Sequence, residues 1–103
     1  MNTGIMAMIQ GKELVVLEIS ICYTDCQLEL VLKGLFNKTS FIVCFYNVSR
    51  INIQMLSNPM VIHGFEIVCN KQEGWDRDSN YMVHDFEDNC ISFFCEKIEG
   101  YEI

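Results

Sequence analysis

The 103-residue chain contains one proline and six glycines. So few of these residues exclude flexible linkers and low-complexity tracts. No apolar run approaches the roughly 18 to 20 residues that a membrane-spanning helix needs. The start of the chain, MNTGIMAMIQG, lacks the basic residues and the long apolar block of an export signal. These absences predict one cytoplasmic domain over residues 1–103, long enough to bury a core without disulfides or metals.

Basic residues are also scarce, with seven Lys and Arg against fourteen Asp and Glu, for a net charge of −7. Residues 1–70 carry five acidic and four basic side chains, whereas residues 71–103 carry nine acidic and three basic ones. An acidic surface repels nucleic acid, because phosphate binding needs Lys and Arg. It attracts basic proteins and accelerates their encounter. The alternative interpretation is a solvated acidic surface that keeps the protein soluble.

Half of the residues are hydrophobic, and in several segments they alternate with polar residues. A period of two is typical of a strand with one buried face. The pattern predicts an all-β domain, an antiparallel sandwich or barrel of about seven strands. The expected strands cover residues 13–22, 28–33, 40–46, 51–55, 61–69, 81–86 and 90–98.

One of these segments, residues 40–46, is apolar on both faces, which is typical of a strand that is covered on both sides. The alternation also predicts which residues form the core. They are Val15, Leu17, Ile19, Leu28, Leu30, Phe41, Val43, Phe45, Ile67 and Phe93.

Six cysteines stand at positions 22, 26, 44, 69, 90 and 95. Because no export signal precedes them, we expect reduced thiols that pack as small hydrophobic side chains, and neither disulfides nor a bound metal. The alternative is a zinc site formed by two pairs, Cys22 with Cys26 and Cys90 with Cys95. Their spacings of three and four intervening residues lie outside the usual two-residue zinc knuckle.

Two further patterns suggest chemistry but fail in detail. Asp76, Asp78, Asn80 and Glu87 occupy positions one, three, five and twelve of a calcium-binding loop, but Tyr81 stands where that loop needs glycine. A small hydrolase or metal-dependent enzyme using His84, Asp85 and cysteines is the alternative function. Since Asp85 follows His84 on a strand, the two side chains should lie on opposite faces. We therefore expect no catalytic residues, no metal and no cofactor.

The favoured function is a non-enzymatic protein-binding module whose acidic C-terminal third binds a basic protein. A polar loop over residues 70–80 carries the single tryptophan and leads into the strand that ends near residue 86. We expect this loop and the following hairpin turn to form one surface patch. Its predicted partner-binding residues are Trp75, Asp76, Asp78, Asp85, Glu87 and Asp88.

Phe93 and Phe94 are adjacent on a strand, so one should enter the core and the other should face outward. An outward phenylalanine and exposed strand edges make a homodimer a further expectation.

The segments YMVHDFEDNCISFFCEKIEGYEI and FYNVSRINIQ resemble small bacterial proteins, some of which are immunity proteins of polymorphic-toxin systems. The resemblance spans residues 41–103 and consists of an acidic hairpin and alternating phenylalanines. It implies a cytoplasmic protein that binds and neutralises a toxin through an acidic face.

Overall fold

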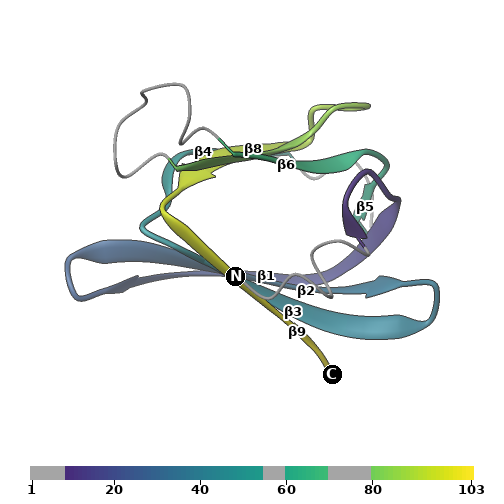
Figure 1. Ribbon diagram of the computed structural model, residues 1–103, viewed down its shortest axis with the longest axis horizontal. Coiled ribbons are helices and arrows are strands. Elements are labelled where there is room, and N and C mark those ends of the chain that lie inside the picture. Colours follow the sequence, from purple (N-terminus) through teal and green to yellow (C-terminus); the bar gives the residue numbers. More distant parts are fainter. Residues whose placement is uncertain (1–8, 55–59, 70–79) are drawn as a thin grey trace.

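The computed structural model describes residues 9–54, 60–69 and 80–103, and it confirms the all-β class. In that part of the chain, nine strands form two antiparallel sheets that face each other as a sandwich (Figure 1). The strands are β1 Leu14–Thr24, β2 Gln27–Phe36, β3 Thr39–Tyr46, β4 Ser49–Ile53, β5 Met60–Ile62, β6 Phe65–Cys69, β7 Tyr81–Asp85, β8 Ile91–Cys95 and β9 Lys97–Glu102. Among the described residues, no helix has the length and apolar character needed to cross a membrane.

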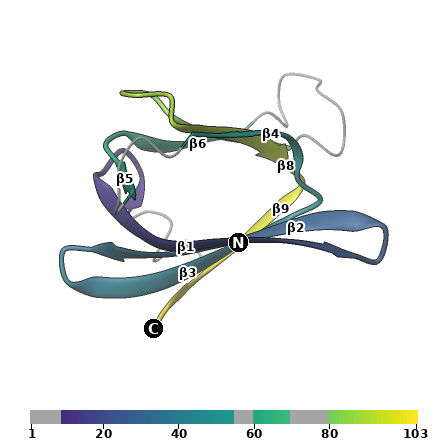
Figure 2. The ribbon, with the colours of Figure 1, turned by 180° about the vertical axis from the view of Figure 1, so that it is seen from behind.

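The five-stranded sheet has the order β5-β1-β2-β3-β9, and the four-stranded sheet has the order β4-β8-β7-β6. The chain changes sheet four times, between β3 and β4, β4 and β5, β5 and β6, and β8 and β9. Seen from behind, the last strand descends from the upper sheet to the lower one (Figure 2). The hairpin β1–β2 projects beyond the upper sheet at one end of the molecule (Figures 1 and 2).

Two of the expected strands are each divided in two. The segment 61–69 bends at His63 and Gly64, so that β5 joins the five-stranded sheet and β6 joins the four-stranded one. The segment 90–98 bends at Glu96, where its amide donates a hydrogen bond to the Tyr46 carbonyl over 2.9 Å. These two bends account for nine strands in place of about seven.

The core lies between the sheets and draws on both of them. Five of the ten residues predicted for it are fully buried, namely Leu30, Phe41, Val43, Phe45 and Phe93. Three more are partly buried against the core, namely Ile19, Leu28 and Ile67. Phe45 and Phe93 meet edge to face across the two sheets, with ring centroids 4.8 Å apart.

The prediction that Val15 and Leu17 belong to the core is wrong. Leu17 is 57 % exposed, and Val15 is only partly buried. The cause is a β-bulge between Val16 and Glu18, which shifts the register of β1 against β2. Because a bulge inserts one residue, it moves the inward face from the even-numbered Leu14 and Val16 to the odd-numbered residues beyond.

Candidate functional site

The turn between β7 and β8, residues 85–90, is the best-defined functional candidate in the described structure, and we call it the acidic turn. It is built around Asp85, which is 1 % exposed. Asp85 Oδ1 accepts hydrogen bonds from the amides of Gly64 and Glu87 at 3.0 and 3.1 Å. Its Oδ2 accepts one from the Cys90 thiol at 3.0 Å and a longer one from the Cys90 amide at 3.4 Å. One carboxylate therefore ties the turn to itself and to the neighbouring bend.

That bend, residues 62–65 between β5 and β6, packs directly against the acidic turn. The Phe86 amide donates a hydrogen bond to the Gly64 carbonyl over 2.9 Å. A Cβ atom at Gly64 would lie 2.8 Å from both the Phe86 ring and Glu87 Cγ. A side chain at position 64 would therefore displace Phe86 and Glu87 from their observed positions.

The acidic turn presents one aromatic and two acidic side chains to solvent. Phe86 is 50 % exposed, and Glu87 and Asp88 are also exposed. His63 lies beside them, with its Nδ1 3.8 Å from Asp88 Oδ2. The hydrogen bonds to Asp85 fix the backbone that carries these side chains. A backbone fixed in this way would lower the entropic cost of binding a partner.

Electrostatics within the acidic turn favour an ionised Asp85 and a neutral Cys90. Burial raises the pKa of Asp85, but hydrogen bonds from the Cys90 thiol and from the amides of Glu87, Cys90 and Asp88 outweigh it, so the pKa is lowered overall. Burial, followed by the hydrogen bond to Asp85 and its charge, raises the pKa of Cys90 to about 12. The thiol is therefore a hydrogen-bond donor at neutral pH and not a nucleophile.

The structure describes three of the six residues predicted to bind a partner, namely Asp85, Glu87 and Asp88. Glu87 and Asp88 are exposed together on the acidic turn, but the expectation that Asp85 shares their surface is wrong, because its carboxylate is buried. Trp75, Asp76 and Asp78 lie outside the described residues. That the loop and the turn form one patch therefore stays a prediction.

Sequence reasoning missed Phe86 and the buried role of Asp85. Tyr81 and Val83 pack in or against the core, and Asp85 follows them at intervals of two, so alternation along β7 is the signal that points Asp85 inward. The excess of acidic residues around Asp85 favours the opposite interpretation, an exposed carboxylate. Nothing in the sequence alone indicates that Gly64 packs under Phe86.

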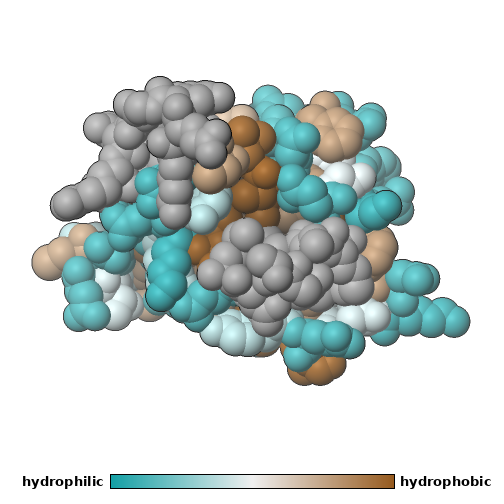
Figure 3. Space-filling model, in the orientation of Figure 1, coloured by the Kyte–Doolittle hydropathy of each residue, from teal (hydrophilic) through white to brown (hydrophobic). Residues whose placement is uncertain are grey.

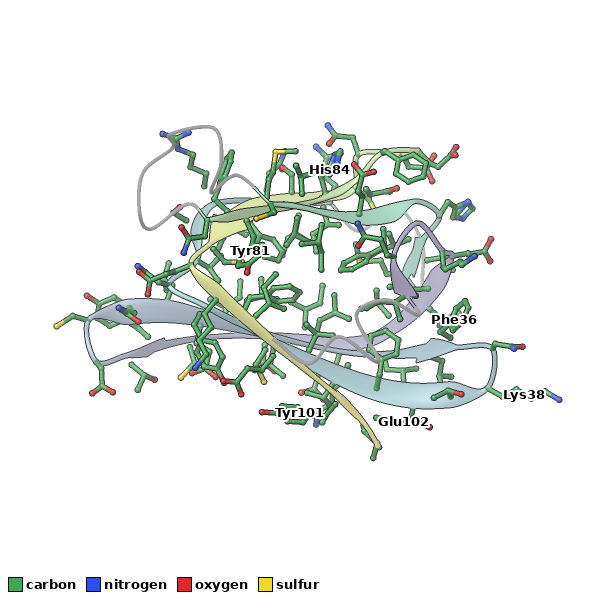
Figure 4. The ribbon with its side chains drawn as sticks, in the orientation of Figure 1. Phe36, Lys38, Tyr81, His84, Tyr101 and Glu102 are labelled. Carbon is green, nitrogen blue, oxygen red and sulfur yellow. The ribbon has the colours of Figure 1, made fainter. Side chains whose placement is uncertain are left out.

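The residues of the alternative enzyme do not form one site, because Asp85 is buried against Cys90 whereas His84 contacts Glu66. His84 lies on the outer face of the four-stranded sheet, above the upper sheet in Figure 4, and its Nε2 is 2.7 Å from Glu66 Oε1. Ser92 on β8 is the cross-strand neighbour of His84, and Glu66 on β6 is its neighbour on the other side. Ser92, His84 and Glu66 therefore stand in the order of a serine-hydrolase triad across three strands. However, the backbone of β7 pairs with strands on both sides, so its amides are not available to bind an oxyanion.

The four cysteines of the alternative zinc site are also apart. Cys22 and Cys26 are exposed on the β1–β2 hairpin of the five-stranded sheet, whereas Cys90 and Cys95 are buried in the other sheet. Among the described residues, no group of three or more His, Cys, Asp or Glu is placed to hold a metal ion. The expectation that the cysteines pack in apolar surroundings is correct for Cys90 and Cys95 and wrong for the exposed Cys22, Cys26 and Cys69.

We expect alkylation to divide the cysteines into a fast and a slow class. Burial raises the pKa of Cys95 to about 12, as burial and Asp85 do for Cys90. At pH near 8, iodoacetamide should therefore label the three exposed thiols and leave these two unmodified until the protein is denatured. Peptide mass mapping measures this, and the intact mass before labelling reports any disulfide. Equal rates for Cys90 and Cys69 in the folded protein would contradict the prediction.

Comparison of the chain with models of protein families, with curated proteins and with solved structures finds no match.

Proposed function

We propose that this protein is a non-enzymatic binding module that docks a basic protein on the acidic turn. The observation that carries the proposal is the buried Asp85 carboxylate, which fixes a turn whose exposed side chains include Phe86, Glu87 and Asp88. An ordered aromatic side chain beside two carboxylates suits a partner with an apolar group flanked by lysine or arginine.

The rest of the charge supports a basic partner. The described residues hold eleven acidic and five basic side chains, a difference of −6 out of the −7 of the whole chain. Such a field attracts a cationic protein from a distance, and the ordered turn then supplies the contact. Together with the resemblance to toxin-immunity proteins, this favours neutralisation of a basic toxin. The free cysteines, three of them exposed, fit a reducing compartment, and we place the protein in the bacterial cytoplasm.

The test compares two double variants that remove the same charge. Glu87→Gln with Asp88→Asn removes the two exposed charges of the acidic turn. The control, Asp25→Asn with Glu102→Gln, removes two exposed charges elsewhere, one at the tip of the β1–β2 hairpin and one on β9. The probe is a short peptide with one aromatic residue between lysines and arginines, titrated into isotope-labelled protein and followed by NMR. We expect the turn variant to weaken binding about tenfold and the control to weaken it less than about threefold.

Kinetics sharpen the test. Loss of the two charges should reduce the association rate more than it raises the dissociation rate. The difference in association rate between the variant and the native protein should shrink as the salt concentration rises. The proposal fails if both variants weaken binding equally, or if the peptide shifts no resonance of residues 86–88.

A further inference from the structure

Part of β1 forms an open edge of the five-stranded sheet. Within the described residues, β5 pairs only with residues 14–16 of this strand, whereas β2 pairs with it as far as Thr24. We call residues 17–24 the open edge. Every residue of the open edge except Ile19 is exposed. It lies in the hairpin that projects beyond the upper sheet (Figure 1), and it is therefore accessible to another chain.

The turn of the hairpin determines which backbone groups the open edge offers. Asp25 and Cys26 both have a positive φ, 52° and 63°, as in a two-residue type I′ turn. Such a turn is closed by a hydrogen-bonded pair, here Thr24 with Gln27, and hydrogen-bonded pairs alternate with non-bonded ones from there along the strand. The amides and carbonyls that point away from β2 therefore belong to Ile19, Ile21 and Tyr23.

The partner strand agrees with this alternation. Leu28 stands opposite Tyr23, and its carbonyl accepts a hydrogen bond from the Val48 amide over 2.9 Å on the other side of β2. The Leu28 carbonyl thus points away from β1. Leu28 and Tyr23 are a non-hydrogen-bonded pair, as the alternation requires.

The residues whose backbone groups face outward also carry apolar side chains on the core side of the sheet. Ile21 stands opposite the fully buried Leu30, yet Ile21 is 49 % exposed and Tyr23 is 69 % exposed. The end of the hairpin, at the left of the space-filling view, accordingly shows apolar and near-neutral residues beside hydrophilic ones (Figure 3). An edge that combines outward backbone groups with exposed apolar side chains is a template for pairing with another strand.

The other strand edges that the structure describes are each protected against such pairing. β9 carries the ion pair of Lys97 with Glu99, β5 has only three residues, and the register of β4 shifts around Arg50. On the edge of β6, the side-chain amide of Gln10 donates a hydrogen bond to the Ile67 carbonyl at 2.8 Å and accepts one from its amide at 3.1 Å. Charges, short strands, bulges and covering segments keep sheet edges from pairing with other chains. In the described structure, residues 19–24 show none of these devices.

We infer that the chain forms a homodimer in which two open edges pair antiparallel about a two-fold axis through Ile21. Each Ile21 then stands opposite the second copy's Ile21, and Ile19 stands opposite the second copy's Tyr23. In both kinds of pair, the backbone groups that face the edge meet and exchange N–H···O=C bonds in both directions. The five-stranded sheets of the two copies become one continuous sheet.

The open edge is complementary to itself, which favours a second copy over a strand of another protein. A two-fold axis makes each face of the strand meet the same face of its copy. The apolar face therefore meets apolar residues, and on the outer face Ser20 stands opposite Cys22. Glu18, the only charged residue of the open edge, stands opposite the uncharged Thr24. The second hairpin turns directly after Thr24, so its tip lies beside Leu17 and stops short of the residues that pair with β5.

The charges near the open edge predict how salt acts on the dimer. Glu18 lies 4.0 Å from Lys33 and accepts a hydrogen bond from Ser20 in its own chain. The two copies of Glu18 are six residues apart along the paired strands, about 20 Å, which exceeds a Debye length. The nearest like charges are Glu18 and the second copy's Asp25, at the exposed ends of the pair. Added salt should therefore strengthen the dimer, whereas it weakens the binding of a basic protein.

The inference is independent of the proposed function. The acidic turn belongs to the four-stranded sheet and lies at the opposite end of the molecule from the β1–β2 hairpin (Figure 1). It stays accessible in the dimer, so loss of the dimer and loss of partner binding are separate results.

The first experiment is sedimentation of the full chain over about 1 to 300 μM, a range suited to a small interface. We expect the mass to rise with concentration from 12.0 kDa toward twice that value, and the dimer to tighten about twofold from low to high salt. Ile21→Lys sets two like charges opposite each other and should weaken the dimer at least tenfold. Tyr101→Lys makes the same kind of change at an exposed residue of β9 and should leave it within about threefold of the native protein.

A second experiment tests the register and decides the matter if Ile21→Lys fails to fold. Ser20→Cys places a thiol opposite the second copy's Cys22 in a non-hydrogen-bonded pair, where the Cα atoms lie about 4.5 Å apart, close enough for a disulfide. Thr24→Cys is the matched control, because it also places a thiol two residues from Cys22 of its own strand but opposite Glu18 of the second copy. Under mild oxidation, Ser20→Cys should form covalent dimers at least fivefold faster, as measured on non-reducing gels.

Three results would overturn the inference. A monomer at every concentration would leave the open edge to a strand of another protein. A dimer that tolerates Ile21→Lys, or equal rates of cross-linking for Ser20→Cys and Thr24→Cys, would place the contact between copies elsewhere.

Discussion

Replacing Phe45 by alanine is expected to lower the free energy of unfolding by about 3 to 5 kcal/mol. Phe45 is fully buried on β3, and its ring contacts Phe93 of β8 edge to face at 4.8 Å. Truncation removes the transfer free energy of a large apolar side chain and leaves a cavity between the two sheets. It also removes an aromatic pair that contributes roughly 0.5 to 1.5 kcal/mol beyond burial.

The consequence is severe because a domain of this size is stable by only about 5 to 15 kcal/mol. Urea unfolding followed by circular dichroism measures the loss. The matched control is Phe94→Ala, one residue along β8 from Phe93, where the side chain lies on the outer face and is only partly buried. We expect the control to cost less than half as much. If Phe45→Ala and Phe94→Ala were equally destabilising, the assignment of inner and outer faces would be incorrect.

The division between Phe93 and Phe94 shows what the sequence predicts well. Strict alternation over several residues fixes which side chains enter the core, because a side chain on a strand has only two directions available. This holds for β3 and β8, whose inward residues are all buried. The hairpin turn between β1 and β2 was also predictable. Asp25 there has a positive φ of 52°, a conformation that aspartate adopts more readily than most residues.

The register of β1 could not be predicted, and the reason is physical. A bulge inserts one residue without requiring a particular amino acid, so the composition does not reveal it. It nevertheless moves every side chain beyond it to the opposite face of the sheet. In β1 the bulge after Val16 exposes Leu17 although both are apolar. Gly34, opposite Val16, has no space for a side chain, since a Cβ would lie 2.7 Å from the Phe41 ring. That constraint comes from the partner strands and not from the local sequence.

The acidic turn was predicted in part. The sequence indicates a tight hairpin and an excess of acids, and both Glu87 and Asp88 are exposed there. The sequence does not indicate which of these acids is buried. A buried carboxylate is distinguished by the hydrogen-bond donors around it, and two of the donors to Asp85 come from Gly64 and Cys90. The proposed function of the turn therefore depends on a residue whose carboxylate is buried.

Replacing Asp85 by alanine is the second change with a large expected effect, a loss of about 3 to 5 kcal/mol at neutral pH. It leaves the Gly64 amide, the Cys90 amide and the Cys90 thiol without their acceptor in a buried site. Unsatisfied buried donors cost roughly 1 to 3 kcal/mol each, partly offset as the turn relaxes. Asp85→Asn keeps the size and one acceptor oxygen, but it aims an amide nitrogen at one set of donors. We expect its cost to be about half as large.

Acid should reproduce the effect of the substitution in the native protein. Hydrogen bonding lowers the pKa of Asp85 in the folded state despite burial, whereas the unfolded carboxyl titrates near 3.9. Its contribution is then fully present above the unfolded pKa and is lost as pH falls through the folded value. The free energy of unfolding should therefore decline below a pH of about 4, and it should decline less steeply in Asp85→Asn.

Glu99 supplies the control for this acid effect. The hydrogen bond from Tyr101, followed by Lys97, lowers the pKa of Glu99, but this pair lies on the surface. Added salt should suppress its contribution and leave that of the buried Asp85 largely intact, because screening acts mainly on exposed charges. Unfolding curves from pH 7 to 2 at low and high salt, for the native protein, Asp85→Asn and Glu99→Gln, separate the two. If Asp85→Asn matched the native protein in both stability and pH dependence, the carboxylate would not hold the turn, and the ordered display of Phe86, Glu87 and Asp88 would lose its physical basis.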